Sequence, residues 1–172
     1  MESGAVFSDD RVYRYFLYRR WNVYLPVVNF IGLNPSTADE EQDDPTIRRC
    51  IAFARDWGYG AVWMTNLYAF RSTDPKVLRW MRLEEANGSE NDHHLARRGN
   101  AADLVIVAWG AHGLQRRNRA RDVLRLLYGK TLHCLRVTKG GHPSHPLYLP
   151  KNLTPTLYRG SSNVVSQDVG HA

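Results

Sequence analysis

The sequence predicts a three-layer α/β/α sandwich, in which helices cover both faces of a central, mainly parallel sheet of four strands. Apolar runs at 27–33, 61–67, 104–109 and 131–136 are typical of buried strands. Segments with helical periodicity separate these runs, and a strand–helix–strand order favours parallel pairing. The aromatic, partly alternating run at 12–18 predicts one more strand, which we expect to form an N-terminal antiparallel hairpin with 27–33.

The connecting helices begin and end at residues that favour helix termini. Asp44-Pro45 supplies a capping side chain and a proline suited to the first turn, and Gly58 ends the same helix. A second Asp-Pro pair begins a shorter helix at 74–81. Residues 89–102 begin with a capping-box pattern, and a basic helix follows at about 116–128. Each predicted helix therefore lies between two predicted strands.

The length and composition indicate one globular domain. We expect residues 1–150 to form a single α/β domain and residues 151–172 to be a polar C-terminal tail. No apolar run approaches the roughly 20 residues of a membrane helix, and residues 1–10 lack the apolar segment of a signal peptide. Two cysteines do not make a disulfide framework. These features argue against a membrane partner and favour the cytoplasm.

Positive charge is concentrated in the second half of the chain. Residues 1–92 carry 11 Lys and Arg against 14 Asp and Glu, whereas residues 93–172 carry 12 against 3. A basic half favours nucleic acid, DNA above all, or a nucleotide as the partner, although a solvated basic surface has the same composition. The candidates for contacts with a phosphate backbone are Arg117, Arg121, Arg125 and Lys139.

The most informative segment is the loop that follows the first central strand. Its residues, Gly32-Leu33-Asn34-Pro35-Ser36-Thr37, offer a side-chain amide, two hydroxyls and backbone N–H groups, with no cysteine or histidine. These groups suit a planar polar molecule or an anion better than a metal ion. Parallel strands place their carboxyl ends at one sheet edge, so we expect this loop to meet the loops at 65–71, 109–113 and 142–147.

Five motifs are distinctive: Leu33-Asn34-Pro35-Ser36-Thr37-Ala38-Asp39, Asp43-Asp44-Pro45-Thr46-Ile47-Arg48-Arg49-Cys50, Trp57-Gly58-Tyr59-Gly60, Asn66-Leu67-Tyr68-Ala69-Phe70-Arg71 and His145-Pro146-Leu147-Tyr148-Leu149. Together they resemble a bacterial and phage family that is catalogued only as a domain of unknown function. The resemblance covers about residues 12–150. It indicates a family and implies no activity.

Gly32-Leu33-Asn34-Pro35, Asn66 and a later His-Pro-Ser occur in an order similar to the motifs of the uracil-DNA glycosylase superfamily. The resemblance implies a uracil-DNA-glycosylase-like fold, in which Asn34 positions the attacking water and Asn66 reads the polar edge of a base. The superfamily histidine, which stabilises charge on the departing base, corresponds to His142 by its His-Pro-Ser motif. The first resemblance points instead to His145, and we expect His145 to be the site histidine.

These features predict a nucleobase- or nucleotide-directed enzyme, in particular a DNA N-glycosidase that excises a modified or mismatched base. We expect no cofactor and no metal, since His93 and His94 point about 100° apart on a helix. The candidate catalytic residues are Asn34, His145 and Asp43, the last as a loop carboxylate able to orient water. The candidate substrate-binding residues are Gly32, Leu33, Pro35, Ser36, Thr37, Asn66, Tyr68, Phe70, Arg71, Trp109, Gly110 and His142.

Other interpretations stay open at this point. The same pocket could belong to a non-catalytic module that binds a nucleotide or nucleic acid. The acidic loop 39–44 could instead serve a metal-dependent hydrolase. Asn34 also suits a turn cap, Asp44 a helix cap and Arg71 an ion pair with the acidic loop.

Overall fold

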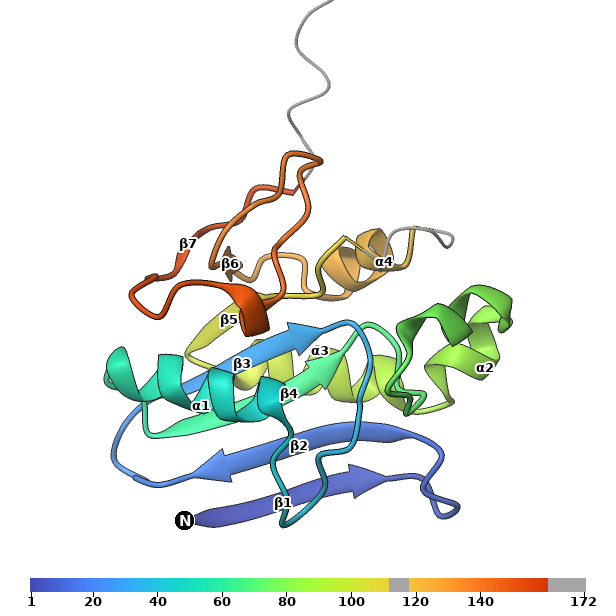
Figure 1. Cartoon of the computed structure of the whole chain (residues 1–172), viewed down its shortest axis with the longest axis horizontal. Coiled ribbons are helices and arrows are strands. Elements are labelled where there is room, and N and C mark those ends of the chain that lie inside the picture. The colour runs from blue at the N-terminus through green and yellow to red at the C-terminus, as the bar shows by residue number, and fades with distance from the viewer. Residues whose placement is uncertain (112–117, 161–172) are drawn as a thin grey trace, which may run out of the picture.

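The computed structural model describes residues 1–111 and 118–160, which form a mixed α/β fold around one seven-stranded sheet (Figure 1). Along the sheet the strands follow the order β1-β2-β4-β3-β5-β6-β7. Their bounds are Glu2–Phe7 (β1), Arg14–Arg20 (β2), Val27–Gly32 (β3), Ala61–Asn66 (β4), Leu104–Val107 (β5), His133–Cys134 (β6) and Thr156–Leu157 (β7). β4, β3, β5 and β6 pair in parallel, and the outer strands pair antiparallel with their neighbours. The predicted α/β class is confirmed, and the sheet is wider than predicted.

The predicted hairpin between 12–18 and 27–33 is wrong. β2 pairs with β1 on one side and with β4 on the other. β3 has no edge left for β2, because parallel strands β4 and β5 occupy both of its edges. The hairpin partner is β1, whose small and polar residues give little strand signal in the sequence.

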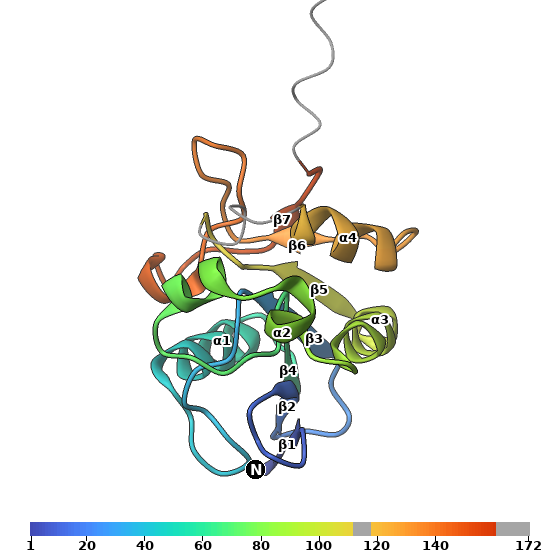
Figure 2. The ribbon, with the colours of Figure 1, turned by 90° about the vertical axis from the view of Figure 1, so that its right-hand side faces the viewer.

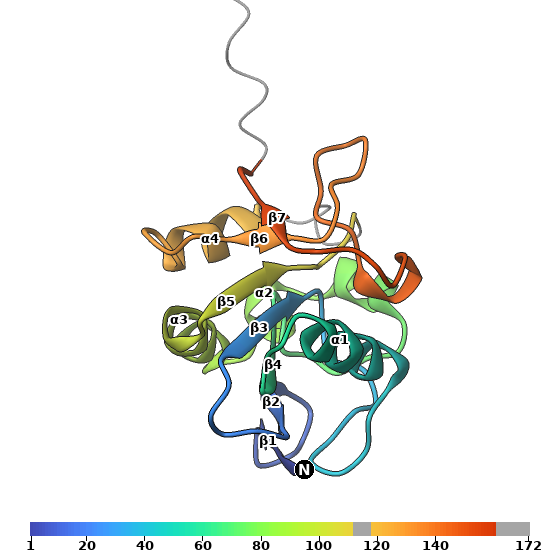
Figure 3. The same cartoon turned by 90° about the vertical axis from the view of Figure 1, so that its left-hand side faces the viewer.

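Helices cover both faces of the sheet, as Figures 2 and 3 show from opposite sides. α1 packs on one face, and the apolar sides of α3 and α4 pack on the other. The helices are α1 (Pro45–Asp56), α2 (Leu83–Asn87), α3 (Asn91–Ala101) and α4 (Arg119–Leu126), with 3₁₀ helices η1 (Pro75–Trp80) and η3 (Pro146–Tyr148).

Local capping explains where two of these helices start. Asp44 caps α1 by accepting a hydrogen bond from the Ile47 N–H (2.9 Å), and Asp74 caps η1 in the same way through Lys76. The predicted capping box at 89–92 does not form, because Glu90 precedes α3 and makes no side-chain cap bond.

The connections between the parallel strands leave a crevice at their carboxyl edge. The chain leaves β3 through α1 on one face and leaves β5 toward α4 on the other face. The two connections diverge, so the carboxyl ends of β3 and β5 are not covered by one helix. In open α/β sheets this is where ligands bind.

The expected polar tail at 151–172 is partly structured. β7 pairs antiparallel with β6, and the Trp57 indole Nε1 donates to the Leu153 carbonyl oxygen (3.0 Å). The ring of Tyr158 packs edge-on against Trp109. Part of the segment that looked like a tail therefore contributes to the sheet and the core.

Candidate functional site

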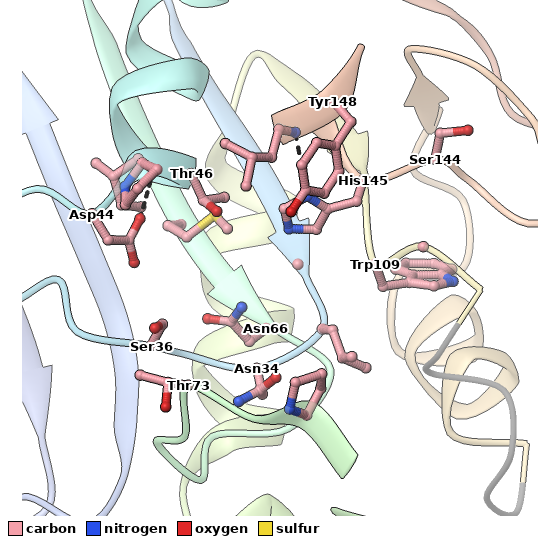
Figure 4. A pocket seen from close by; sticks show the side chains of 18 of the residues that line it. Asn34, Ser36, Asp44, Thr46, Asn66, Thr73, Trp109, Ser144, His145 and Tyr148 are labelled. Carbon is pink, nitrogen blue, oxygen red and sulfur yellow. Dashed lines mark hydrogen bonds between the residues drawn. The ribbon is translucent and has the colours of Figure 1, made fainter.

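A cavity of about 620 Å³ opens at the carboxyl edge of β3, β4 and β5 (Figure 4). Its volume falls in the range of small-molecule sites. The sheet topology brings eight of the predicted site residues to its walls: Gly32, Leu33, Asn34, Ser36, Asn66, Trp109, Gly110 and His145.

The loops after β3 and β4 are joined backbone to backbone below the cavity. The Leu67 N–H donates to the Gly32 carbonyl oxygen (2.9 Å), and the Ser72 N–H donates to that of Pro35 (2.9 Å). The Asn34 amide nitrogen adds bonds to the carbonyl oxygens of Pro35 and Ser72, each 3.0 Å long. Asn34 therefore locks the two loops together, and its remaining polar atom on the cavity wall is the acceptor oxygen Oδ1.

Asn66 lies in the middle of the cavity in Figure 4. Its side chain makes no hydrogen bond with any described residue, although the residue is only 2% exposed. Gly32 is its partner in the parallel register, and a Cβ there would lie 2.8 Å from Asn66 Nδ2. The glycine at 32 therefore makes room for the Asn66 amide, which offers a hydrogen-bond donor and an acceptor at the cavity wall.

A buried polar network fixes the backbone of this strand end. Asn91 Nδ2 donates to the carbonyl oxygens of Asn66 and Leu67, both at 3.1 Å. Arg119 Nε donates to the same Leu67 oxygen (2.8 Å), and its Nη2 bonds Asp92 (2.5 Å). The Arg119 guanidinium lowers the pKa of the Asp92 carboxyl, against the opposing effect of burial, which is larger in itself. The first residues of α3 and α4 thus hold the β4 loop in place.

Of the two candidate histidines predicted from the sequence, His145 lines the cavity and His142 does not. The Nδ1 of His145 accepts a hydrogen bond from the Leu147 N–H (3.3 Å). In the neutral ring this bond places the proton on Nε2, which makes Nε2 a donor. The loop is attached to the end of β5 by a bond from the Gly110 N–H to the Pro143 carbonyl oxygen (2.8 Å).

Trp109 lies at the opposite end of the cavity from Asp44 in Figure 4. The residue is buried, and its ring packs edge-on against Tyr158. Its Nε1 has no acceptor among the described residues and lies at the end of the ring that points away from Asn66. The indole therefore offers the cavity an apolar wall.

The acidic loop is held by arginines and backbone groups. Asp43 forms an ion pair with Arg19 (2.8 Å) and does not line the cavity, so its expected catalytic position is not supported. Glu40 is bridged by Arg11, whose hydrogen bonds lower the Glu40 pKa to about 2. Asp44 is the carboxylate of this loop that lines the cavity. Asp44 is the helix cap that the sequence predicted, whereas the ion pair of Asp43 with Arg19, a residue of a distant strand, could not be read from the sequence.

Several predicted residues lie away from the cavity walls. Tyr68 is buried in the core, Phe70 packs against Tyr13, and Arg71 donates to the Arg11 carbonyl oxygen (3.2 Å). Arg71 makes no ion pair with the acidic loop in the described structure. The remaining predicted residues outside the lining are Pro35, Thr37 and His142.

The predicted phosphate-backbone residues that the structure describes do not line the cavity. Arg121 and Arg125 are exposed on α4, which packs on the face of the sheet opposite α1. Lys139 is exposed in the turn before His142, and its neighbour Thr138 lines the cavity. Arg117 lies outside the described residues.

Several cavity residues were missed by the sequence analysis, and Arg14 and Tyr148 are the two with the clearest binding chemistry. Arg14 of β2 is buried and lines the cavity. In the sequence it belongs to an alternating, aromatic-rich segment that indicated a strand and gave no sign of a binding role. Tyr148 is 88% exposed at the end of η3 and also lines the cavity. Tyr148 belongs to the motif His145–Leu149, but its exposed position at the end of η3 could not be read from the motif.

No three His, Cys, Asp or Glu side chains within residues 1–111 and 118–160 are grouped closely enough to hold a metal ion. None of the helices in these same ranges has the length and apolar character needed to cross a bilayer.

The fold and the cavity define an α/β protein with a small-molecule-sized site at the carboxyl edge of its parallel strands. The chain belongs to the family described as "Protein of unknown function (DUF1643)", whose model matches residues 14–147. This match confirms the expected membership of a family of unknown function. No curated protein matches the chain, and no solved structure matches it either.

Proposed function

We propose that the protein is a nucleobase-directed enzyme, whose cavity holds a base against Asn66 and hydrolyses the bond between that base and its sugar. The observation that carries the proposal is the Asn66 side chain, buried on the cavity wall with no hydrogen bond to the described chain. The Asn66 amide lines the cavity, so its donor and its acceptor are available to a ligand. A ligand edge with adjacent donor and acceptor atoms, as nucleobases have, can pair with both through hydrogen bonds.

The surroundings of Asn66 fit a flat, partly polar ring. Trp109 supplies an apolar wall, and Tyr148 supplies an exposed ring at the cavity mouth. Stacking of a base on an aromatic side chain contributes about 1–3 kcal/mol. His145, with Nδ1 accepting from Leu147, has Nε2 as a donor for an oxygen or nitrogen of the base.

The chemistry requires charge to be stabilised at both ends of the breaking bond. Water adds its oxygen to the anomeric carbon, the carbon–nitrogen electron pair leaves with the base, and the proton lost by water ends on the base. A donor such as His145 Nε2 stabilises the departing base, an effect worth about 2.7–4 kcal/mol for one well-placed donor. Asp44 takes the place that the sequence suggested for Asp43, as the cavity carboxylate able to orient the water.

The test is release of free base, measured by chromatography. The substrates are duplexes that contain uracil, hypoxanthine or a methylated base, together with the matching nucleosides and nucleotides. We expect release from at least one substrate class, loss with His145→Ala, and retention with the matched control His142→Ala, since His142 does not line the cavity. If no substrate releases free base, the proposed enzymatic activity is wrong. Binding of a nucleotide without any product would favour a non-catalytic nucleotide-binding module. This module is the second candidate, because the Asn34 amide nitrogen bonds the backbone of the two loops and has a structural role in this protein.

A further inference from the structure

Arg14 differs from the other buried arginines of the described chain. Arg19 and Arg119 each form an ion pair with an aspartate, at 2.8 and 2.5 Å. Arg14 is 2% exposed and has no carboxylate within ion-pair distance among the described residues. Its Nη1 donates to the Ala38 carbonyl oxygen (2.9 Å), and its Nε has no partner in that part of the chain. A buried cation without a counter-ion is costly, so its presence on a cavity wall calls for an anion.

The guanidinium is still charged at neutral pH. Burial lowers the pKa of Arg14 to about 10, with the charge of Asp44 opposing that effect and the charges of Arg71 and Arg19 adding to it. A pKa of about 10 leaves the group protonated at pH 7. The unpaired positive charge is therefore present under the conditions in which a ligand binds.

The N-terminus of α1 faces the same part of the cavity. Asp44, Pro45, Thr46 and Ile47 all line it. Pro45 has no N–H group, and the Ile47 N–H is already bound by Asp44 Oδ1. The Thr46 N–H, in the first turn of a 12-residue helix, has no partner within the helix and lies at its positive end.

Hydroxyl groups complete this end of the cavity. Ser36, Thr46, Ser72 and Thr73 line it together with Arg14. Figure 4 shows Ser36, Thr46 and Thr73 on the side of Asn66 away from Trp109. The cavity thus has an apolar, aromatic end and an end rich in hydrogen-bond donors, with the Asn66 amide between them.

We propose that Arg14, the Thr46 N–H and the Ser36 hydroxyl bind the phosphate monoester of a mononucleotide. This assignment rests on the proposed function, because the phosphate belongs to the molecule whose base lies against Asn66. Phosphate is recognised by arginine and by helix N-termini through charge-assisted hydrogen bonds. The Asp44 carboxylate lies on the same cavity wall and its charge acts on Arg14, but it forms no ion pair with that arginine among the described residues, and its Oδ1 is engaged by the Ile47 N–H.

The position of Arg14 favours a free nucleotide over a strand of nucleic acid. The arginine is buried at the cavity wall, so a phosphodiester bound there would have to accommodate a second sugar next to a buried side chain, whereas a terminal phosphate would not. The exposed arginines that could follow a strand, Arg121 and Arg125, lie on α4 across the sheet from α1. The basic helix and the phosphate end of the cavity are therefore not one continuous surface.

The experiment compares binding of nucleosides, their 5′-monophosphates, single-stranded oligonucleotides and inorganic phosphate to the full chain by calorimetry. In the wild-type protein we expect at least one 5′-monophosphate to bind tenfold or more tightly than its nucleoside. Arg14→Met should abolish that difference and leave nucleoside affinity within twofold. Met is a long, flexible apolar side chain, and it removes a buried charge that has no ion-pair partner in exchange for the loss of one hydrogen bond to the Ala38 carbonyl oxygen, so this variant should fold. Arg14→Lys, which keeps the charge, should retain part of the difference.

The outcomes separate this inference from the proposed function. Equal affinity for a nucleoside and its monophosphate, or a difference that survives Arg14→Met, overturns the phosphate site while base binding stands. An oligonucleotide that binds more tightly than every monophosphate overturns the choice of a mononucleotide. If no base, nucleoside or nucleotide binds, the proposed function fails. Thermal stabilisation by inorganic phosphate in the wild type, but not in Arg14→Met, would then still support an anion site at Arg14.

Discussion

The side chain of Asn91 holds the backbone of Asn66, since its Nδ2 donates to the Asn66 carbonyl oxygen at 3.1 Å. Asn91 is completely buried at the start of α3, and the same nitrogen also bonds Leu67 and Asn87. A residue that does not itself line the cavity therefore helps to fix where the Asn66 amide lies. Support of this kind is what keeps a binding group within reach of its ligand.

Replacement of Asn91 should cost both stability and binding. Asn91→Asp removes the amide donor and puts a carboxylate next to two buried carbonyl oxygens. We expect a loss of at least about 2–3 kcal/mol in the free energy of unfolding, because buried acceptors lose their partners. Urea denaturation measures this loss. Asn100→Asp, the same change at an exposed position of α3, is the control and should stay within about 0.5 kcal/mol of the wild type.

Asp44 allows its capping role to be separated from its place in the cavity. Asn caps helices as well as Asp does, so Asp44→Asn should preserve stability, whereas Asp44→Ala should lose about 0.5–2 kcal/mol. If the carboxylate orients the attacking water, both variants should lose base release by at least about 100-fold. Thermal unfolding and the chromatographic assay give the two readouts. Full activity of Asp44→Asn would remove the carboxylate from the mechanism.

Tyr148 should act as the stacking residue at the cavity mouth. Tyr148→Ala should weaken nucleobase binding by about 1–3 kcal/mol, which is roughly 5- to 150-fold, and Tyr148→Phe should retain it. Tyr128→Ala is a matched control, because Tyr128 is 93% exposed and Tyr148 is 88% exposed. Only Tyr148 lines the cavity. Calorimetric titration that finds the two alanine variants equal would show that the exposed ring plays no part in binding.

His94 should make stability depend on pH. Burial, then the charges of Arg98 and His93, lowers its pKa, and only Glu90 opposes them. The unfolded chain therefore binds a proton more readily than the folded chain, so the folded state loses stability as pH falls below about 6.5 toward the lower folded pKa. Denaturation at several pH values should show this loss in the wild type. His94→Gln should flatten the dependence, and His93→Gln should reduce it only in part, because burial and the charge of Arg98 still lower the His94 pKa.

Local signals were read correctly from the sequence, and contacts between distant segments were not. The apolar runs of β3, β4 and β5 and the Asp44 cap depend on neighbouring residues, so their patterns are visible along the chain. Parallel strand ends then bring Asn66 and His145 to one edge without further information.

The site residues that were not predicted correctly from the sequence depend on tertiary contacts. Arg14 looks like an outward polar residue of an alternating strand, and it is buried only because the loop containing Ala38 crosses it. Phe70 was expected to stack on a base, but packing against Tyr13 directs it away from the cavity. No spacing rule in the sequence distinguishes Phe70 from Tyr148, the aromatic residue that does line the cavity.

The most direct test of the base site is an NMR titration of the ¹⁵N-labelled protein with uracil, cytosine, adenine and guanine. The chain of 19.7 kDa is small enough for side-chain amide signals to be resolved, and Asn66→Asp identifies the Asn66 pair. We predict that at least one base shifts the Asn66 side-chain amide signals and the Gly110 backbone amide in a saturable way, while the exposed Asn100 amide stays unchanged. Shifts that map outside the cavity, or an Asn66 amide that responds to none of the four bases, would contradict the account.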